Sequence, residues 1–216
     1  MPGHARPHHS DGDGDDPEPT HVRTHGADAH SVRAAEEAVA DAVKAGRAGN
    51  SAARVTHGAG PAGGRPDGHP TRISAKQDAA VQRSLDRENS AAETLAAQGF
   101  RIKQNPTRDE VARARQDTGD TGSPDSDPDY LLEGRVFDCY SPGATKPVRG
   151  IWSEVEEKVL DRAQTQRVVV NLADWTGDLA ALRKQFADWP IAGLREAKAI
   201  TPNGDIVQLD LHPDND

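Results

Sequence analysis

The aromatic residues of this chain are confined to one stretch, which limits where a hydrophobic core can form. All eight lie between Phe100 and Trp189. Residues 1–74 contain no aromatic residue and no Leu, yet they hold eight of the nine His. A segment without large apolar side chains buries too little surface to offset the entropy lost on folding. We therefore expect a disordered tail rich in Gly, Pro and His over residues 1–74, and one folded domain over residues 75–216.

One segment of the tail has helical periodicity. Val32, Ala35, Val39 and Val43 recur at the spacing of a helix face, which predicts a short helix over residues 32–46. A lone, weakly apolar helix of this length is marginal in water. The histidines of the tail show neither paired Cys nor a repeated short spacing, so they do not indicate a specific metal site.

The charge and hydropathy of the chain exclude several classes of protein. The net charge is −9, and residues 75–216 carry 18 Lys and Arg against 25 Asp and Glu. This balance argues against broad, non-specific coating of DNA, but it allows a nucleic-acid enzyme whose carboxylates bind metal. The sequence has no run of 18 apolar residues and no secretion signal at its start. We expect no membrane insertion by this segment, and its location in the producing cell stays open.

Regular patterning begins after Ser74. Apolar spacing and turn residues predict a long helix closed by Gly99, a short strand, and a polar insertion in which TRDE forms a capping box. The elements expected after it are strands at 130–133 and 135–140, a helix at 151–166, a buried strand at 167–173, a helix at 178–189 entered through Thr176, and strands at 198–202 and 205–211. This order predicts an α/β fold with a central mixed β-sheet flanked by helices.

Two charged residues interrupt apolar helix faces. At about 100° per residue, Glu88 falls in the middle of the stripe that begins with Val81 and ends with Leu95. On the later helix, Lys158 lies on the face of Ile151 and Val155, together with Arg162. Each residue alone has an ordinary explanation: an ion pair at the sheet edge for Glu88, and a side chain that reaches to water along its own stem for Lys158.

Two aspartates accompany them. The alternation of RVFDCY places Asp138 on the same strand face as Val136 and Tyr140, where a charge is disfavoured. Asp129 follows Pro128 at the start of the preceding strand, a position that also suits ordinary turn chemistry. Three carboxylates and a lysine in unfavourable positions together indicate a functional cluster. Such carboxylates can hold Mg²⁺ or Mn²⁺ against a phosphate, and a nearby lysine can neutralise developing charge.

Several ordered motifs resemble one family. They are DRENSAAETLAAQGFRIKQNP, DPDYLLEGRVFDCYSP, VRGIWSEVEEKV, QTQRVVVNLADW and LRKQFADWPIAGL, over about residues 78 to 200. Together they resemble the C-terminal tRNA-nuclease domain of CdiA-type contact-dependent growth inhibition toxins, a branch of the PD-(D/E)XK, restriction-endonuclease-like superfamily.

The resemblance implies a PD-(D/E)XK nuclease-like fold and a metal-dependent endonuclease. It assigns Glu88, Asp129 and Asp138 as metal ligands and catalytic residues, Lys158 as the catalytic lysine, and Gln164 as a positioning residue. The expected metal is Mg²⁺ or Mn²⁺, with Zn²⁺ as the alternative. Four basic residues are candidates for phosphate contacts, namely Lys146, Arg149, Arg162 and Arg167.

The resemblance further implies a tRNA substrate, a cognate immunity protein, and a toxin that acts in the cytoplasm of a target cell. Three other interpretations stay open on the sequence. The same site fits a DNase toxin. The fold also fits a catalytically inactive interaction module, which the acidic surface favours. Finally, the four charged residues fit a buried ion-pair network with a structural role only.

Overall fold

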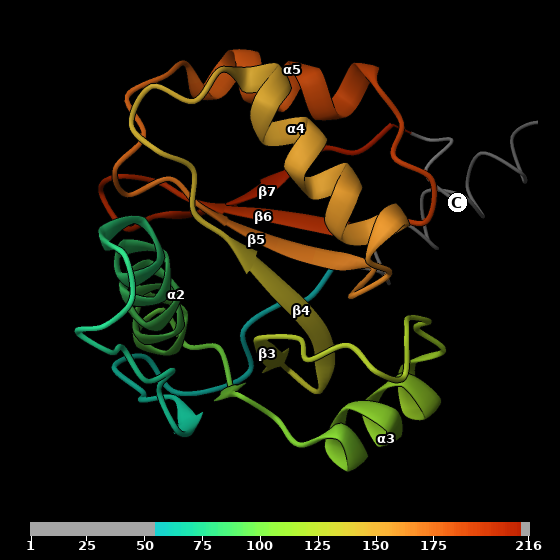
Figure 1. The fold of residues 1–216 in the computed structure, drawn as a ribbon. Coiled ribbons are helices and arrows are strands. Elements are labelled where there is room, and N and C mark those ends of the chain that lie inside the picture. Colours follow the sequence, from blue (N-terminus) through green and yellow to red (C-terminus); the bar gives the residue numbers. More distant parts are fainter. Residues whose placement is uncertain (1–54, 213–216) are drawn as a thin grey trace, which may run out of the picture. The chain divides into compact units, whose positions relative to one another are not determined.

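A seven-stranded mixed sheet organises residues 55–212, which are the residues described by the computed structural model (Figure 1). The strands lie side by side in chain order: β1 (Asp67–Gly68), β2 (Ile102–Gln104), β3 (Tyr130–Leu132), β4 (Arg135–Tyr140), β5 (Arg167–Asn171), β6 (Glu196–Ile200) and β7 (Ile206–Leu209). The pairs β1/β2, β4/β5 and β5/β6 are parallel, and the other three are antiparallel. The predicted mixed α/β architecture is confirmed. The predicted helix at 32–46 lies outside the described residues.

Helices cover both faces of this sheet. α4 (Val148–Glu156) and α5 (Leu179–Asp188) pack over β5, β6 and β7, whereas α2 (Ala79–Ala97) packs on the opposite face (Figure 1). α3 (Arg108–Thr118) packs beside β4. α4 continues into a short π-helix, η1 (Glu157–Asp161). No helix within residues 55–212 is long and apolar enough to cross a bilayer.

Capping residues set the helix boundaries. The TRDE capping box is confirmed: the Thr107 side chain accepts from the backbone N–H of Glu110, and Glu110 bonds back to the N-cap. Gly99 ends the first long helix in the left-handed region at φ +89°, as predicted. The predicted helix at 178–189 is observed as α5, but the predicted entry through Thr176 is wrong: Asp178 caps the helix by accepting from Ala180 N.

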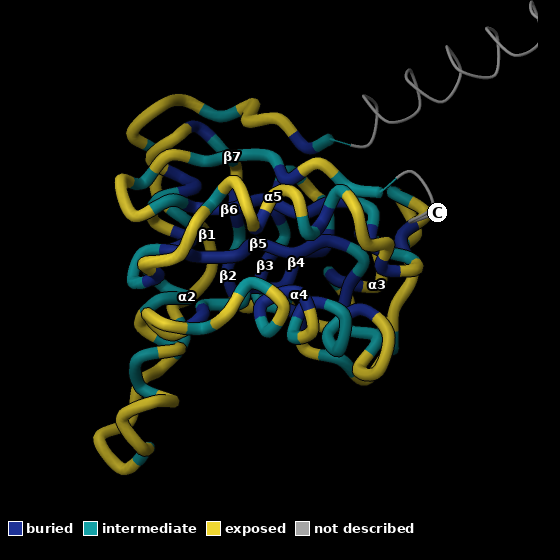
Figure 2. The backbone as a smooth tube through the Cα atoms, turned by 90° about the horizontal axis from the view of Figure 1, so that it is seen from above, coloured by how far each residue is buried: buried dark blue, intermediate teal, exposed yellow. Residues whose placement is uncertain are grey.

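The two larger clusters of the core lie on opposite faces of the sheet, and the strands β5 and β6 between them are buried (Figure 2). One cluster joins α4, α5 and the strands β5 to β7, and the other joins α2 to β2, β3 and β4. The predicted apolar stripes are only partly correct. Val81 is 39% exposed, because burial of α2 begins near Ala91. Arg162 is also exposed, because η1 ends the helix at Asp161.

Residues 55–72, which we call the strap, belong to the folded unit. The backbone N–H of Thr56 donates to Glu196 Oε1 at 2.8 Å and its hydroxyl to Oε2 at 2.7 Å. Further along, Gly60 N donates to Gly99 O at 2.8 Å, and β1 pairs with β2. The predicted domain boundary at residue 75 is therefore too late.

The partner of β4 changes midway along the strand, and this change positions the charged residues discussed below. Residues Arg135 to Phe137 pair with β3, whereas Asp138 to Tyr140 pair with β5. The β3–β4 hairpin turns through Glu133 and Gly134, both at positive φ (49° and 76°), which is the conformation of a two-residue type I′ turn. Asp138 is thus the first residue of β4 beyond its pairing with β3.

Candidate functional site

Asp138 and Lys158 form a buried ion pair beside the point where β4 changes partner. Lys158 Nζ donates to Asp138 Oδ2 at 2.8 Å, and the two side chains are 16% and 1% exposed. Burial would lower the pKa of Lys158, but the charge of Asp138 and their hydrogen bond raise it above its ordinary value. The lysine is thereby held as a cation. It lies in η1, and such π-helical turns are frequent at functional sites.

Asp129 directly precedes β3, and its side chain bonds to the backbone of β4 beyond the end of the β3–β4 pairing. Its Oδ2 accepts a hydrogen bond of 2.7 Å from the backbone N–H of Cys139, on the part of β4 that β3 no longer reaches. Burial raises the pKa of Asp129 well above its usual value, and the negative charge of Asp138, a shared hydrogen bond with it, and the charge of Glu88 raise it further. Burial also raises the pKa of the Cys139 thiol, so this cysteine is disfavoured as a thiolate nucleophile.

Glu88 approaches the same cluster from α2. Burial raises its pKa, the nearby charge of Asp138 adds to this rise, and a hydrogen bond from the Thr71 hydroxyl opposes it. The helix is fixed at this point, because the hydroxyl of Tyr130 on β3 donates to the Glu88 carbonyl oxygen. Glu88, Asp129, Asp138 and Lys158 therefore interact in one place although they come from four segments of the chain.

The cluster holds more carboxyl groups than cations. Three carboxylates face one lysine, and the raised pKa values of Glu88 and Asp129 are in part the effect of their mutual repulsion with Asp138. A purely structural network would be expected to balance its charges, because an uncompensated buried charge is strongly destabilising. The raised pKa values mean that these carboxyl groups tend to hold protons without a metal, and a divalent cation bound here would displace those protons and compensate the carboxylate charges.

Known proteins resemble a large part of this chain. Residues 126–206 match the family described as the contact-dependent growth inhibition CdiA C-terminal domain. A curated relative named tRNA nuclease CdiA-2, from Burkholderia pseudomallei (strain 1026b), is 38% identical over 159 residues, or 73% of this chain. A solved structure described as the CdiA-CT/CdiI toxin and immunity complex, also from Burkholderia pseudomallei, is 36% identical, with a TM-score of 0.57 over 68% of this chain and 99% of that one. The chain belongs to the CdiA C-terminal domain family.

The family match covers three of the four residues of the cluster, and the chain covers little of the full-length relative. The matched stretch 126–206 includes Asp129, Asp138 and Lys158, whereas Glu88 lies before it. The chain spans only 5% of the length of the curated relative.

The carboxylates of the cluster in this CdiA C-terminal domain meet some of the requirements of a site for a hard divalent cation. Carboxylate oxygens are the ligands that Mg²⁺ and Mn²⁺ prefer, and Asp129 and Asp138 are close enough to share a hydrogen bond. Within the described part of the chain, no group of three or more His, Cys, Asp or Glu side chains is arranged to enclose an ion. Two carboxylates are nevertheless sufficient for Mg²⁺, which keeps several of its waters and also binds substrate phosphate.

The predicted phosphate contacts have different environments. Arg167 was assigned wrongly: its side chain is 1% exposed and bonds to Asp120 and Glu196, so it cannot reach a nucleic acid. Lys146 pairs with Glu154 at 2.8 Å, and Arg162 pairs with Glu157. Arg149 stacks on two indole rings, 4.0 Å from the centre of Trp152 and 4.3 Å from that of Trp189. Phosphate contacts by Lys146, Arg149 and Arg162 stay predictions.

Gln164 lies just beyond η1, and its backbone N–H donates to the carbonyl oxygen of Lys158 at 3.0 Å. Its side-chain Oε1 is buried without a hydrogen-bond partner, and no contact joins it to the carboxylates, so its positioning role stays a prediction. The sequence reasoning missed Thr71, which contacts Glu88 directly. No pattern distinguishes this threonine in the sequence, because it lies in a stretch rich in Gly and Pro.

Proposed function

We propose that this CdiA C-terminal domain is a metal-dependent endonuclease that cleaves tRNA. The observation that carries the proposal is the cluster of Glu88, Asp129, Asp138 and Lys158, in which three carboxyl groups, two of them with raised pKa values, surround one lysine. Neither an inactive module nor a structural ion-pair network needs an unpaired excess of carboxylates. A metal-dependent phosphodiester hydrolase does, because a cation bound there would meet the anionic substrate.

The proposed reaction is hydrolysis of a phosphodiester. The oxygen of a water molecule bonds to phosphorus, the bond from phosphorus to the leaving ribose oxygen breaks, and the proton of the water ends on that leaving oxygen. A divalent cation held by the carboxylates would supply a Lewis acid and lower the pKa of a bound water. Lys158, held as a cation by Asp138, would stabilise the negative charge that develops on the phosphate oxygens. Asp129, whose carboxyl group accepts from Cys139 N, and Asp138 on β4 would hold the reacting groups in place.

The substrate and the biological role are inferred from relatives. The relative that is 38% identical carries the name tRNA nuclease, which supports tRNA as the substrate of this chain. The similar solved structure is a complex of a toxin with its immunity protein. We infer that this chain is the toxic module of a contact-dependent inhibition system, that it acts in the cytoplasm of a target cell, and that a cognate immunity protein binds it.

A parallel digestion tests the proposed function. The purified chain is incubated with total tRNA and with plasmid DNA in Mg²⁺, beside the variant Glu88→Gln, which removes one carboxylate charge with little change of shape. We expect discrete tRNA fragments with the wild type and none with the variant. Nicked plasmid with intact tRNA would change the substrate to DNA. Intact tRNA and plasmid in every lane would contradict a nuclease function.

A further inference from the structure

We propose that Thr71 is a positioning residue of the site: its hydroxyl fixes the carboxylate of Glu88, and the strap holds that hydroxyl in place. The inference rests on the proposed nuclease function. It assigns a role to a segment that precedes α2 and lies outside the stretch 126–206 matched by the family.

The hydrogen bonds around Thr71 fix the direction of its hydroxyl. Thr71 Oγ1 accepts from Asn105 Nδ2 at 2.9 Å and donates to Glu88 Oε1. The other acceptor near the hydroxyl, Asn105 Oδ1, is more distant at 3.3 Å. A hydroxyl has one proton, so a donor on its oxygen leaves that proton for the carboxylate. Glu88 thereby gains a charge-assisted hydrogen bond, one of the stronger kinds.

The backbone of Thr71 is clamped as firmly as its side chain. Asn89, the residue after Glu88, accepts from Thr71 N at 2.8 Å and donates to Thr71 O at 2.9 Å. Gln104 of β2 donates to the same Asn89 oxygen at 3.0 Å, so the clamp is tied to the sheet. Asn105 also donates to the His69 carbonyl oxygen at 2.7 Å. These amide side chains hold Thr71 at one position on the surface of α2.

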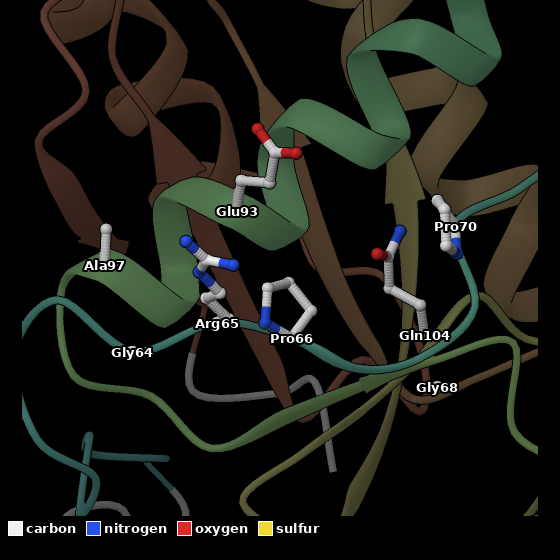
Figure 3. A pocket seen from close by; sticks show the side chains of 8 residues that line it. All are labelled: Gly64, Arg65, Pro66, Gly68, Pro70, Glu93, Ala97 and Gln104. Carbon is white, nitrogen blue, oxygen red and sulfur yellow. The ribbon is translucent and has the colours of Figure 1, made fainter.

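This clamp is needed because the strap is not packed tightly against α2 just before Thr71. A pocket of about 530 Å³ separates them, lined on the strap by Gly64, Arg65, Pro66, Gly68 and Pro70, on α2 by Glu93 and Ala97, and on β2 by Gln104 (Figure 3). Side-chain packing therefore contributes little to the placement of the strap there. The hydrogen bonds at Thr71, together with the β1/β2 pairing, fix it again beside Glu88.

A fixed Glu88 matters for catalysis because its carboxylate lies among like charges. Asp138 and Asp129 repel it, and it has a flexible side chain with several rotamers. Without the Thr71 hydroxyl, repulsion would turn the carboxylate away from the cluster. Small displacements of a catalytic group are costly, since about 1 Å can lower a rate by roughly 100-fold.

Steady-state kinetics of tRNA cleavage by the full chain test this role. Thr71→Val keeps the shape of the side chain and removes its hydroxyl, and Thr71→Ser keeps the hydroxyl. We expect Thr71→Val to lower kcat by about 10- to 100-fold with KM unchanged within about twofold. Thr71→Ser is expected to retain most of the activity. Thr56→Val is the matched control, because it removes another strap hydroxyl that bonds a buried carboxylate, that of Glu196, away from the cluster. It should lower the melting temperature and leave kcat unchanged.

Four results would overturn the inference. They are an unchanged kcat in Thr71→Val, an equal loss in Thr71→Ser, a loss of kcat in Thr56→Val as large as that in Thr71→Val, and loss of the thermal unfolding transition in Thr71→Val. The last result would make the hydroxyl structural. A wild-type chain that cleaves neither tRNA nor DNA would instead refute the proposed function, so the two failures are distinguishable.

Discussion

Removing the charge of Lys158 and removing the charge of Asp138 should change stability in opposite directions, although both substitutions should abolish cleavage. In the wild type, three carboxylates face one lysine. Lys158→Met leaves Glu88, Asp129 and Asp138 without any cation. Asp138→Asn keeps the lysine, which still interacts with the two remaining carboxylates. The first change increases the imbalance of charge and the second reduces it.

The size of the stability change follows from the burial of the pair: the Lys158 side chain is 16% exposed and that of Asp138 is 1% exposed. Removing one partner of a buried ion pair costs about 3–5 kcal/mol when the other charge is left uncompensated. For a domain of this size, 1 kcal/mol shifts the melting temperature by about 2–4 °C, so Lys158→Met should melt roughly 6–20 °C lower than the wild type. Asp138→Asn leaves no uncompensated charge of that kind, so it should melt at or above the wild-type temperature.

Differential scanning calorimetry of the two variants in EDTA provides the measurement. The difference in melting temperature between Lys158→Met and the wild type should become smaller as the pH is lowered. The raised pKa values of Glu88 and Asp129 mean that these groups take up protons at higher pH than usual, and protonation removes the repulsion as the pH falls. Equal destabilisation by the two substitutions would refute the reasoning, because a balanced structural ion pair predicts that result.

Three further predictions concern the cluster and its surroundings. Asp129→Asn should raise the melting temperature and abolish cleavage, because it removes a crowded negative charge while the new amide oxygen still accepts from Cys139 N; an unchanged or lower melting temperature would contradict the raised pKa of Asp129. Chelation with EDTA should stop tRNA cleavage and added Mg²⁺ or Mn²⁺ should restore it, as followed on a denaturing gel; cleavage that persists in EDTA would refute metal dependence. Arg167→Met should cost up to about 3–5 kcal/mol in urea unfolding, because it leaves the buried carboxylates of Asp120 and Glu196 with Arg195 and Lys198 as their remaining ion-pair partners, and a loss below about 1 kcal/mol would contradict this.

The positions of Asp138 and Lys158 could be predicted because they depend on local periodicity. Alternation along β4 and helical spacing from α4 into η1 place a charge on a buried face whatever the rest of the fold does. The contact between Asp129 and Cys139 N could not be predicted in this way. This contact depends on the point along β4 at which pairing with β3 ends and pairing with β5 begins. The register of these strands is set by contacts between distant segments of the chain.

Two errors have the same origin in long-range contacts. Arg167 resembles a surface cation in the sequence, but Asp120 and Glu196, 47 and 29 residues away, bury and neutralise it. The strap resembles a disordered tail because it is rich in Gly. In the structure, Gly68 lies so close to β2 that an added Cβ would be 2.2 Å from the carbonyl oxygen of Gln104. Glycine there permits close approach of two backbones, which composition alone does not distinguish from disorder.

The central claim is that the cluster around Asp138 carries out the cleavage of tRNA. Its most direct test compares tRNA cleavage by Asp138→Asn and Asp210→Asn, the same chemical change at a buried aspartate of the cluster and at an exposed aspartate paired with Arg183. Both variants are first checked for the wild-type circular dichroism spectrum. We predict no fragments from Asp138→Asn and wild-type rates from Asp210→Asn. Cleavage by Asp138→Asn at the wild-type rate would contradict the account.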